Sequence, residues 1–281
     1  MILSIITINY NNKNGLAKTV QSIGSQSRRA FEYIVIDGNS SDGSKNIIEN
    51  NSEFINLWVS EPDSGVYNAM NKGIKMASGD YLLFLNSGDV LADDQVIENV
   101  LPLLDNHSDI ISGNMIYSLN GISQTIFTPP ENISLVYFLR SFLPHPSSFI
   151  RKNLFDKVGF YSENFKIVSD WEFFLKAIVI HQAKYKNINL TVSDFDNSGI
   201  SSNHSNKVLM KNEKQAVYQK YFPNLQNEII LLDFAGSRRM QQIENIHSNH
   251  PFLWKLLKFW LNILNLFVSK KEVRSCKKIR N

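Results

Sequence analysis

The first 90 residues alternate short apolar runs with segments of helical periodicity, and this alternation limits the possible folds more than any other feature of the chain. Runs typical of strands cover residues 3–8, 31–37, 55–60 and 81–85. Apolar residues at helical spacing cover 13–25, 41–49 and 65–77. Ser41 is expected to cap the second of these helices. Strands that alternate with helices through short links form a parallel sheet covered by helices, so we predict an α/β fold.

Polar residues follow each predicted strand at the point where the strand ends. They are Asn9 to Asn11, Asp37 to Ser40, Glu61 to Asp63, and Asn86 to Asp89. In open α/β sheets, ligands bind beyond the carboxyl ends of the strands. The sequence therefore predicts a binding site built by four strand ends at one edge of the sheet.

The pattern is looser after residue 110. Strands are predicted at 110–117, 124–127 and 147–150, and helices at 152–158 and 168–180. Residues 205–250 have a helical composition but carry few chemical signals. The second half of the chain is therefore predicted to complete the sheet and to end in helices.

Two aspartates at strand ends are candidates for ligand chemistry. The carboxylate of Asp89 is a suitable ligand for Mg²⁺ or Mn²⁺, or else it caps the turn or the next helix. Asp37 either accepts a hydrogen bond from a nucleotide or forms an Asx-turn with Gly38. On the residues alone, both alternatives stay open.

Other candidates lie in helices and in a proline-bounded link. Asp63 precedes Gly65, which allows close approach of an anion to a helix N-terminus; the alternative is an N-cap. Asp170 and Glu172 lie two residues apart on a helix and therefore point in different directions, so one can face a cleft while the other faces elsewhere. His145 stands between two prolines and either lines a cleft or is a surface histidine.

Several common sites are excluded by spacing. The histidines show no zinc-ligand spacing, and neither G-x-G-x-x-G nor the P-loop motif occurs. Dinucleotide-binding and P-loop functions therefore lose their main support.

Taken together, these motifs resemble the family 2 glycosyltransferases over about residues 1–205. The most specific segments run from Ser4 to Asn11, Glu32 to Ser44, Asp63 to Gly73, and Ala77 to Asp89. Four segments in the family's order are far more specific than any one of them. The resemblance implies an α/β, GT-A (Rossmann-like) fold with a mostly parallel sheet flanked by helices and a C-terminal helical extension.

The resemblance also implies roles for individual residues. Asp170 would be the catalytic base, and Asp89, which matches the last acid of the D-x-D-like motif, would bind Mg²⁺ or Mn²⁺. The nucleotide-sugar donor would be bound by Thr7, Asn9, Tyr10, Asp37, Asn39, Asp63, Tyr67, Asn71, Asn86 and Ser87. His145 and Trp171 would lie on the acceptor side. The chain departs from the family at Asn86 and Gly88, where more acids are usual, so metal affinity without bound nucleotide should be weak.

The implied reaction is a single displacement with inversion, in which a sugar moves to a hydroxyl of a glycan or lipid-linked sugar. The resemblance is to bacterial enzymes that build capsule, exopolysaccharide or O-antigen repeats. It divides the chain into a GT-A domain (1–205, with a donor half to about 110 and an acceptor half from about 111), a helical extension (206–250) and a terminal segment (251–281). The alternatives are a nucleotidyltransferase and a catalytically weak membrane-associated scaffold.

The terminal segment is predicted to bind an anionic membrane surface. Eight basic residues and one acid lie between Trp254 and Asn281, a net charge of +7, whereas the rest of the chain carries −4. Residues 252–268 have a polar stripe at helical spacing in an otherwise apolar segment, which favours a helix in the membrane interface. The alternatives are docking on the protein's own core or at a dimer interface. Nucleic-acid binding is not expected, because the apolar helix would then have no role.

Location follows from two weaker observations. The single cysteine, Cys276, cannot form a disulfide within the chain, which suits a reducing compartment. Residues 1–7 lack a basic leader and have the pattern of a strand. We therefore expect a cytoplasmic protein, peripheral on the inner face of the plasma membrane. The sequence does not indicate which sugar, acceptor or oligomeric state applies.

Overall fold

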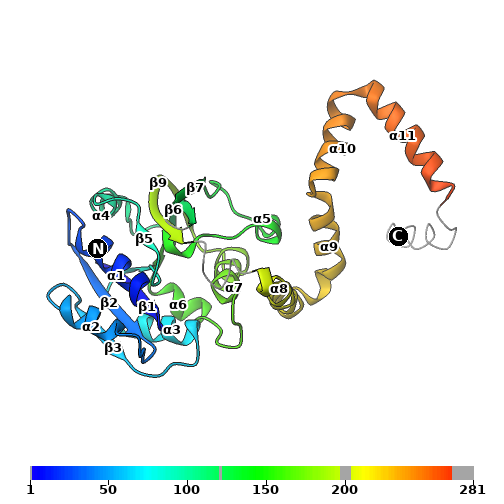
Figure 1. Cartoon of the computed structure of the whole chain (residues 1–281). Coiled ribbons are helices and arrows are strands. Elements are labelled where there is room, and N and C mark those ends of the chain that lie inside the picture. Colours follow the sequence, from blue (N-terminus) through cyan, green and yellow to red (C-terminus); the bar gives the residue numbers. More distant parts are fainter. Residues whose placement is uncertain (1, 120–121, 197–203, 268–281) are drawn as a thin grey trace. The chain divides into compact units, whose positions relative to one another are not determined.

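A computed structural model describes residues 2–119, 122–196 and 204–267, and Figure 1 shows it. The strands are β1 (Leu3–Asn9), β2 (Phe31–Asp37), β3 (Leu57–Ser60), β4 (Tyr81–Phe84), β5 (Val90–Leu91), β6 (Ile110–Leu119), β7 (Ile122–Phe127), β8 (Ser148–Arg151) and β9 (Tyr185–Asp196). The helices are α1 (Lys13–Gly24), α2 (Ser44–Asn50), α3 (Val66–Met76), α4 (Val96–Val100), α5 (Leu135–Arg140), α6 (Leu154–Val158), α7 (Ser169–Leu175), α8 (Lys207–Tyr221), α9 (Gln226–Ala235), α10 (Arg238–Asn249) and α11 (Pro251–Asn265). Contacts divide the chain into two compact units, 1–223 and 224–281.

The strands of the described residues form one nine-stranded sheet in the order β3-β2-β1-β4-β8-β6-β9-β5, with β7 paired to β6. β1 pairs in parallel with β2 and β4, and β2 pairs in parallel with β3. Antiparallel neighbours enter with β8, which lies between β4 and β6, while β9 runs parallel to β6. The predicted α/β class is confirmed, and the four adjacent parallel strands β3-β2-β1-β4 all lie within the first 90 residues.

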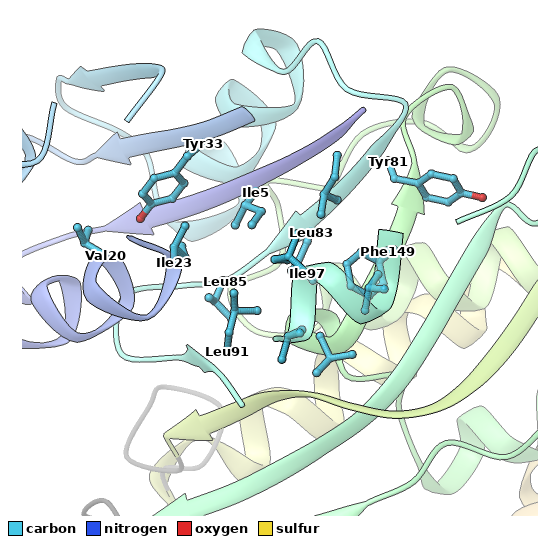
Figure 2. Close-up of a cluster of buried hydrophobic side chains, with 14 of the residues drawn as sticks. Ile5, Val20, Ile23, Tyr33, Tyr81, Leu83, Leu85, Leu91, Ile97 and Phe149 are labelled. Atoms are coloured by element: carbon cyan, nitrogen blue, oxygen red, sulfur yellow. The ribbon is translucent and has the colours of Figure 1, made fainter. Parts of the chain in front are cut away.

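One face of the sheet carries the main apolar core (Figure 2). Alternate residues of neighbouring strands, including Ile5, Tyr33 and Leu83, are fully buried there against Val20 and Ile23 of α1. The two-residue period of a strand puts these side chains on one face. The core therefore fixes the register that brings the ends of β1, β2 and β4 to one edge.

The opposite face packs against α3, α6 and α7. A Cβ on Gly73 would lie 2.5 Å from Ile6 Cγ2, so glycine allows α3 to approach β1 closely. Phe84, Phe155 and Phe173 form a ring cluster in which the last two stack with centroids 4.4 Å apart. This packing joins α7, the helix that carries Asp170, to the end of β4.

Some local expectations are corrected. Ser41 does not cap α2; the N-cap position is Gly43, with φ of 90°, and Asp42 accepts a hydrogen bond from the Ser44 amide at 3.0 Å. The left-handed conformation favours glycine there, so the helix begins later than its pattern predicts. The helix expected at 168–180 is present as α7 followed by a π-helical turn over Lys176–Ile180. The helix α5 was not predicted because it has no clear helical period, and the strand β9 was not predicted although polar and apolar residues alternate from Asn187 to Ser193.

The unit that begins at residue 224 contains α9, α10 and α11. Apolar side chains of α11 are largely exposed, with Phe252 at 72% and both Phe259 and Trp260 at 59%. In α9, Ile230 and Phe234 are 64% and 62% exposed. Within the described ranges, we find no helix that combines the length and the hydropathy needed to span a membrane. Cys276 and the basic residues between 270 and 280, on which the predicted membrane binding partly depends, lie outside the described residues.

Candidate functional site

Asp37, at the end of β2, cross-links three strand ends. It accepts hydrogen bonds from Asn9 Nδ2 at 2.8 Å, from Ser60 Oγ at 2.7 Å, and from the amide and hydroxyl of Ser40 at 3.0 and 2.6 Å. Burial acts to raise the pKa of Asp37, but these hydrogen bonds outweigh it and hold the pKa below its usual value. The carboxylate is therefore ionised at neutral pH, and it fixes the ends of β1, β2 and β3 together.

Tyr10 and Asp63 lie over Gly38 beside these strand ends. A Cβ on Gly38 would lie 2.5 Å from Asp63 Oδ2 and 3.0 Å from Tyr10 Cδ2, so both side chains close over the glycine. The Gly65 amide donates to Asp63 Oδ1 at 2.9 Å. Tyr10 is 67% exposed. An aromatic face beside a carboxylate oxygen suits a planar ring that carries an N–H donor.

The turn from Asn86 to Asp89 follows β4 and is held by α1. The Asp89 amide donates to the Asn86 carbonyl at 2.9 Å, and Gly88 has a φ of 113° that favours glycine. Thr19 Oγ1 donates to the Asp89 carbonyl at 2.7 Å and accepts from the Gly88 amide at 3.0 Å. Asn12 donates to the Ser87 carbonyl at 3.0 Å. The turn is thereby fixed against the first helix.

The donor set at this turn fits a divalent cation that takes further ligands from a diphosphate. The Asp89 carboxylate belongs to a residue only 4% exposed, and Asn86 Oδ1 is buried without a hydrogen-bond partner. Hard cations such as Mg²⁺ and Mn²⁺ prefer oxygen ligands and tolerate few protein ligands when phosphate oxygens are present. No group of three or more His, Cys, Asp or Glu residues with metal-binding geometry occurs in the described part of the chain.

Asp170 lies at the centre of a hydrogen-bonded group, here called the Asp170 cluster, made of Tyr67, Asn86, His145 and Asp170. Tyr67 Oη donates to Asp170 Oδ1 at 2.9 Å. His145 Nδ1 lies 3.3 Å from Asp170 Oδ2, and its Nε2 lies 3.1 Å from Asn86 Nδ2. Side chains from α3, the turn after β4, the 145–147 turn and α7 thus meet at one point.

The charges in the cluster favour an ionised Asp170. Burial acts to raise the pKa of Asp170, but the hydrogen bond and charge of His145 and the Tyr67 hydroxyl outweigh it and lower the pKa. Burial likewise acts to lower the pKa of His145, and the carboxylates of Asp170 and Asp89 outweigh it and raise the pKa. The Asp170 side chain remains 22% exposed. It is therefore an accessible carboxylate that can accept a proton.

The surroundings hold His145 and Asp170 in place. Pro144 precedes His145, and the Pro144 carbonyl accepts from the Ser147 amide at 3.1 Å and from Ser148 Oγ at 2.7 Å. Glu213 of α8 accepts from the backbone amides of residues 166, 167 and 168 at 2.8, 3.1 and 3.3 Å. These contacts fix the turn that carries His145 and the segment that leads into α7.

Glu172 and Trp171 point away from Asp170. Tyr221 Oη donates to Glu172 Oε1 at 2.7 Å, and Glu172 is 2% exposed. Trp171 is 4% exposed, donates its indole N–H to the Ser141 carbonyl at 3.2 Å, and packs against the ring of Tyr218. Both side chains hold α7 against its neighbours. The predicted contact of Trp171 with an acceptor stays a prediction, while its observed role is packing.

Several predicted donor-binding residues make hydrogen bonds within the protein. Thr7 Oγ1 donates to the Leu85 carbonyl at 2.8 Å. Asn71 Nδ2 donates to the Tyr161 carbonyl at 2.9 Å, which ties α3 to the chain before α7. Tyr67 belongs to the Asp170 cluster, as described above. Asn39 is exposed, with a left-handed φ of 62°. Direct contact of these residues with a donor stays a prediction; their observed contacts shape the site.

Sequence reasoning missed residues that support the site. Thr19, Ser40, Ser60 and Glu213 were not singled out, although each holds a strand end or the α7 segment. Ser40 follows Asp37 at the spacing of an Asx-turn, which was a detectable signal. Thr19 and Glu213 act on residues 45 or more positions away, so no local pattern reveals them.

Comparison with known proteins shows which sequence family the chain matches. The family model described as glycosyl transferase family 2 matches residues 4–169. The chain is 35% identical over 205 residues to an uncharacterized glycosyltransferase of Mycobacterium tuberculosis, covering 71% of this chain and 77% of the relative. It is 27% identical over 207 residues to the PGL/p-HBAD biosynthesis glycosyltransferase of Mycobacterium bovis, covering 72% and 79%.

Solved structures share the fold. TarS of S. aureus (residues 1–349, in complex with UDP-GlcNAc) matches with a TM-score of 0.58 at 21% identity, over 70% of this chain and 58% of TarS. The mannosyltransferase PcManGT from Pyrobaculum calidifontis, in complex with GDP-Man and Mn²⁺, matches with a TM-score of 0.56 at 13% identity, over 94% and 80%. The GT-A fold predicted from the sequence is thereby confirmed.

Proposed function

The chain belongs to glycosyl transferase family 2, and on that premise we propose that it moves a sugar from a nucleotide-sugar donor to a hydroxyl of a glycan acceptor, with inversion at the anomeric carbon. The observation that carries this proposal is the bridge made by His145. One imidazole ring joins Asn86, in the turn that holds Asp89, to the accessible carboxylate of Asp170. A site for the leaving diphosphate and a base for the acceptor would then lie on opposite sides of one imidazole ring.

The donor's base is proposed to bind against Tyr10 and Asp63. Tyr10 offers an exposed ring face, and Asp63 Oδ2 offers an acceptor for a base N–H group. The relatives support a nucleotide-sugar donor, since TarS was solved with UDP-GlcNAc and the archaeal mannosyltransferase with GDP-Man. Asp37 holds the neighbouring strand ends together through its hydrogen bonds to Asn9 and Ser60.

Asp89 is proposed to hold Mg²⁺ or Mn²⁺ together with the donor's diphosphate. Such an ion supplies positive charge that stabilises the departing diphosphate. The archaeal mannosyltransferase was solved with Mn²⁺, which supports this choice of ion. Because Asn86 and Gly88 add no acid to the turn, ion binding should depend on the nucleotide.

Asp170 is proposed to act as the general base. Its carboxylate takes the proton of the acceptor hydroxyl while that oxygen attacks the anomeric carbon from the face opposite the leaving group. The new carbon–oxygen bond forms as the bond to the diphosphate breaks, so the configuration inverts in a single step. Glu172 is bonded to Tyr221 and points elsewhere, which supports Asp170 as the base.

The acceptor is proposed to be a lipid-linked glycan presented at a membrane surface. One relative is named a PGL/p-HBAD biosynthesis glycosyltransferase, which supports a role in a biosynthetic pathway. The exposed apolar side chains of α11 and the basic residues that follow it in the sequence suit an anionic membrane. The protein is proposed to bind there peripherally, from the cytoplasmic side.

A screen of nucleotide sugars tests the catalytic part of this proposal. Thermal unfolding is measured with each nucleotide sugar, with and without Mn²⁺, because a ligand of the folded state raises the unfolding temperature. Release of nucleoside diphosphate from the stabilising donor is then measured. One preferred donor with Mn²⁺-dependent release supports the proposal. Failure of every donor to bind or react favours the scaffold alternative, and release of pyrophosphate from a nucleoside triphosphate favours the nucleotidyltransferase.

A further inference from the structure

The carboxylate of Asp170 is held at both oxygens by different elements. Tyr67 Oη donates to Oδ1 at 2.9 Å, and His145 Nδ1 lies 3.3 Å from Oδ2. The Trp171 backbone N–H also donates to this carboxylate, and since a carboxylate offers about four lone-pair sites, about one remains for a substrate proton. Donors on separate oxygens restrict rotation of the carboxylate plane. The side chain keeps 22% of its surface exposed, which leaves an approach for that substrate.

The second ring nitrogen of His145 is also engaged. Asn86 Nδ2 lies 3.1 Å from Nε2, on the side of the ring opposite Asp170. The ring is therefore held between Asn86 and the carboxylate, with Nδ1 facing Asp170. The prolines at 144 and 146 fix the backbone on both sides of the ring.

We propose that His145 is a positioning residue which, with the Tyr67 hydroxyl, fixes the carboxylate of Asp170 relative to the donor-side turn at Asn86. This inference rests on the proposed function. It adds that the geometry of the base depends on Nδ1 of one histidine, and that the donor and acceptor sides of the site are coupled through that ring. A displacement of about 1 Å between reacting groups can lower a rate by about 10²-fold, so loss of this contact should appear in kcat.

The test uses two side chains that each reproduce one ring nitrogen. In His145→Asn the amide lies near the position of Nδ1 and can still donate to Asp170, whereas in His145→Gln it reaches the position of Nε2 and meets Asn86. His145→Ala removes both contacts. Exposed His107 provides the matched control, as His107→Gln. Steady-state transfer by the full-length protein and donor affinity by calorimetry are measured for each variant.

We expect His145→Ala and His145→Gln to lose about 10- to 100-fold in kcat and His145→Asn to recover most of that loss, with donor affinity within twofold of wild type. His107→Gln should match wild type. Tyr67→Phe should also lower kcat, and its effect combined with His145→Gln should be non-additive because both act on one carboxylate. Thermal unfolding shows that each variant is folded.

Three outcomes overturn the inference. Equal losses in His145→Asn and His145→Gln would indicate a general packing role. Parallel loss of donor affinity would assign His145 to donor binding. Unchanged kcat in all His145 variants would leave the ring without a part in the reaction. Each is distinct from failure of the proposed function, in which the wild-type protein itself transfers no sugar.

Discussion

The strand-end region of the α/β unit and the helices α9 to α11 differ in how their side chains are engaged. At the strand ends, polar groups are bonded to each other: Asp37 alone accepts four hydrogen bonds, and Asp170 is held at both oxygens. In α11, by contrast, large apolar side chains such as Trp260 are left exposed to solvent. The first region makes its polar contacts within the protein, whereas the second leaves apolar side chains in contact with solvent.

The difference indicates how each region responds to substitution. A group within a bonded network cannot change without leaving its partners unsatisfied, so single changes there should be costly and specific. An exposed apolar face acts by its summed area, so single changes there should be small and graded. Variants in both regions test that contrast, and we expect the largest loss of transfer in the strand-end region.

Replacing the acid of the donor-side turn should have the largest effect on transfer. In Asp89→Asn the size of the side chain is kept but its charge is lost, and no other acid lies in the turn. We expect transfer to fall by more than about 10³-fold, because charge stabilisation of the leaving diphosphate is lost. Exposed Asp94 gives the control variant, Asp94→Asn, with wild-type activity expected. Wild-type rates in Asp89→Asn would remove the metal assignment.

Substitutions of the proposed base, Asp170, and of its neighbour, Glu172, should separate effects on activity from effects on stability. Asp170→Asn should lower kcat by about 10²- to 10⁴-fold and keep donor binding, since only the proton acceptor is lost. Glu172→Gln should be milder in kcat but should lower the free energy of unfolding by about 1–3 kcal/mol, because buried Glu172 accepts from Tyr221. Rates and chemical denaturation are measured together. If Glu172→Gln is the more damaging to kcat, the choice of base is wrong.

The Asp37 network should contribute stability that depends on pH. Its pKa in the folded protein lies below its ordinary value of about 3.9, so the contribution is fully present above that value and is lost as pH falls through the folded pKa. Asp37→Asn should therefore cost about 1–3 kcal/mol at pH 7, and the difference from wild type should narrow below about pH 4. Denaturation at several pH values measures it. A difference that is constant with pH would contradict the ionised network.

Changes in α11 should affect transfer least and membrane binding in a graded way. Full-length protein should float with anionic vesicles, less at high salt, and a chain ending at His250 should not. Trp260→Glu should weaken flotation by roughly tenfold or more, the effect of losing one buried aromatic side chain, and Asn262→Glu on the polar stripe should weaken it less. All variants should keep wild-type rates on a water-soluble acceptor. Equal flotation of the full-length and shortened chains would refute membrane binding by α11.

The strands and helices of the first 90 residues were predictable because their patterns are local. β1, β2 and β4 are buried on both faces and read as apolar runs, and α3 has a clear helical period. The cap of α2 was predicted wrongly, because Ser41 and Gly43 offer competing starts. β9 was missed although Ile188, Leu190 and Val192 alternate with polar residues, which is a local signal of a strand.

The sequence analysis named candidate residues for the site, but it did not predict the contacts between them. Tyr67 was expected on the donor side through its place beside Asp63, yet its hydroxyl bonds Asp170, 103 positions away. His145 was expected near the acceptor, and its second bond, to Asn86, was not foreseen. Such pairings depend on how α3, β4 and α7 pack together, which no spacing within one segment encodes.

We could predict from the sequence the alternation of strands and helices, the polar strand ends and the opposite directions of Asp170 and Glu172. Each of these follows from the fixed geometry of a strand, a turn or a helix. Only the tertiary structure decided that Asp37 is bonded by three strand ends and that His145 joins Asn86 to Asp170. Local geometry repeats every two or 3.6 residues and can be read along the chain. Hydrogen bonds between distant residues exist only after the apolar core has set the register of the sheet.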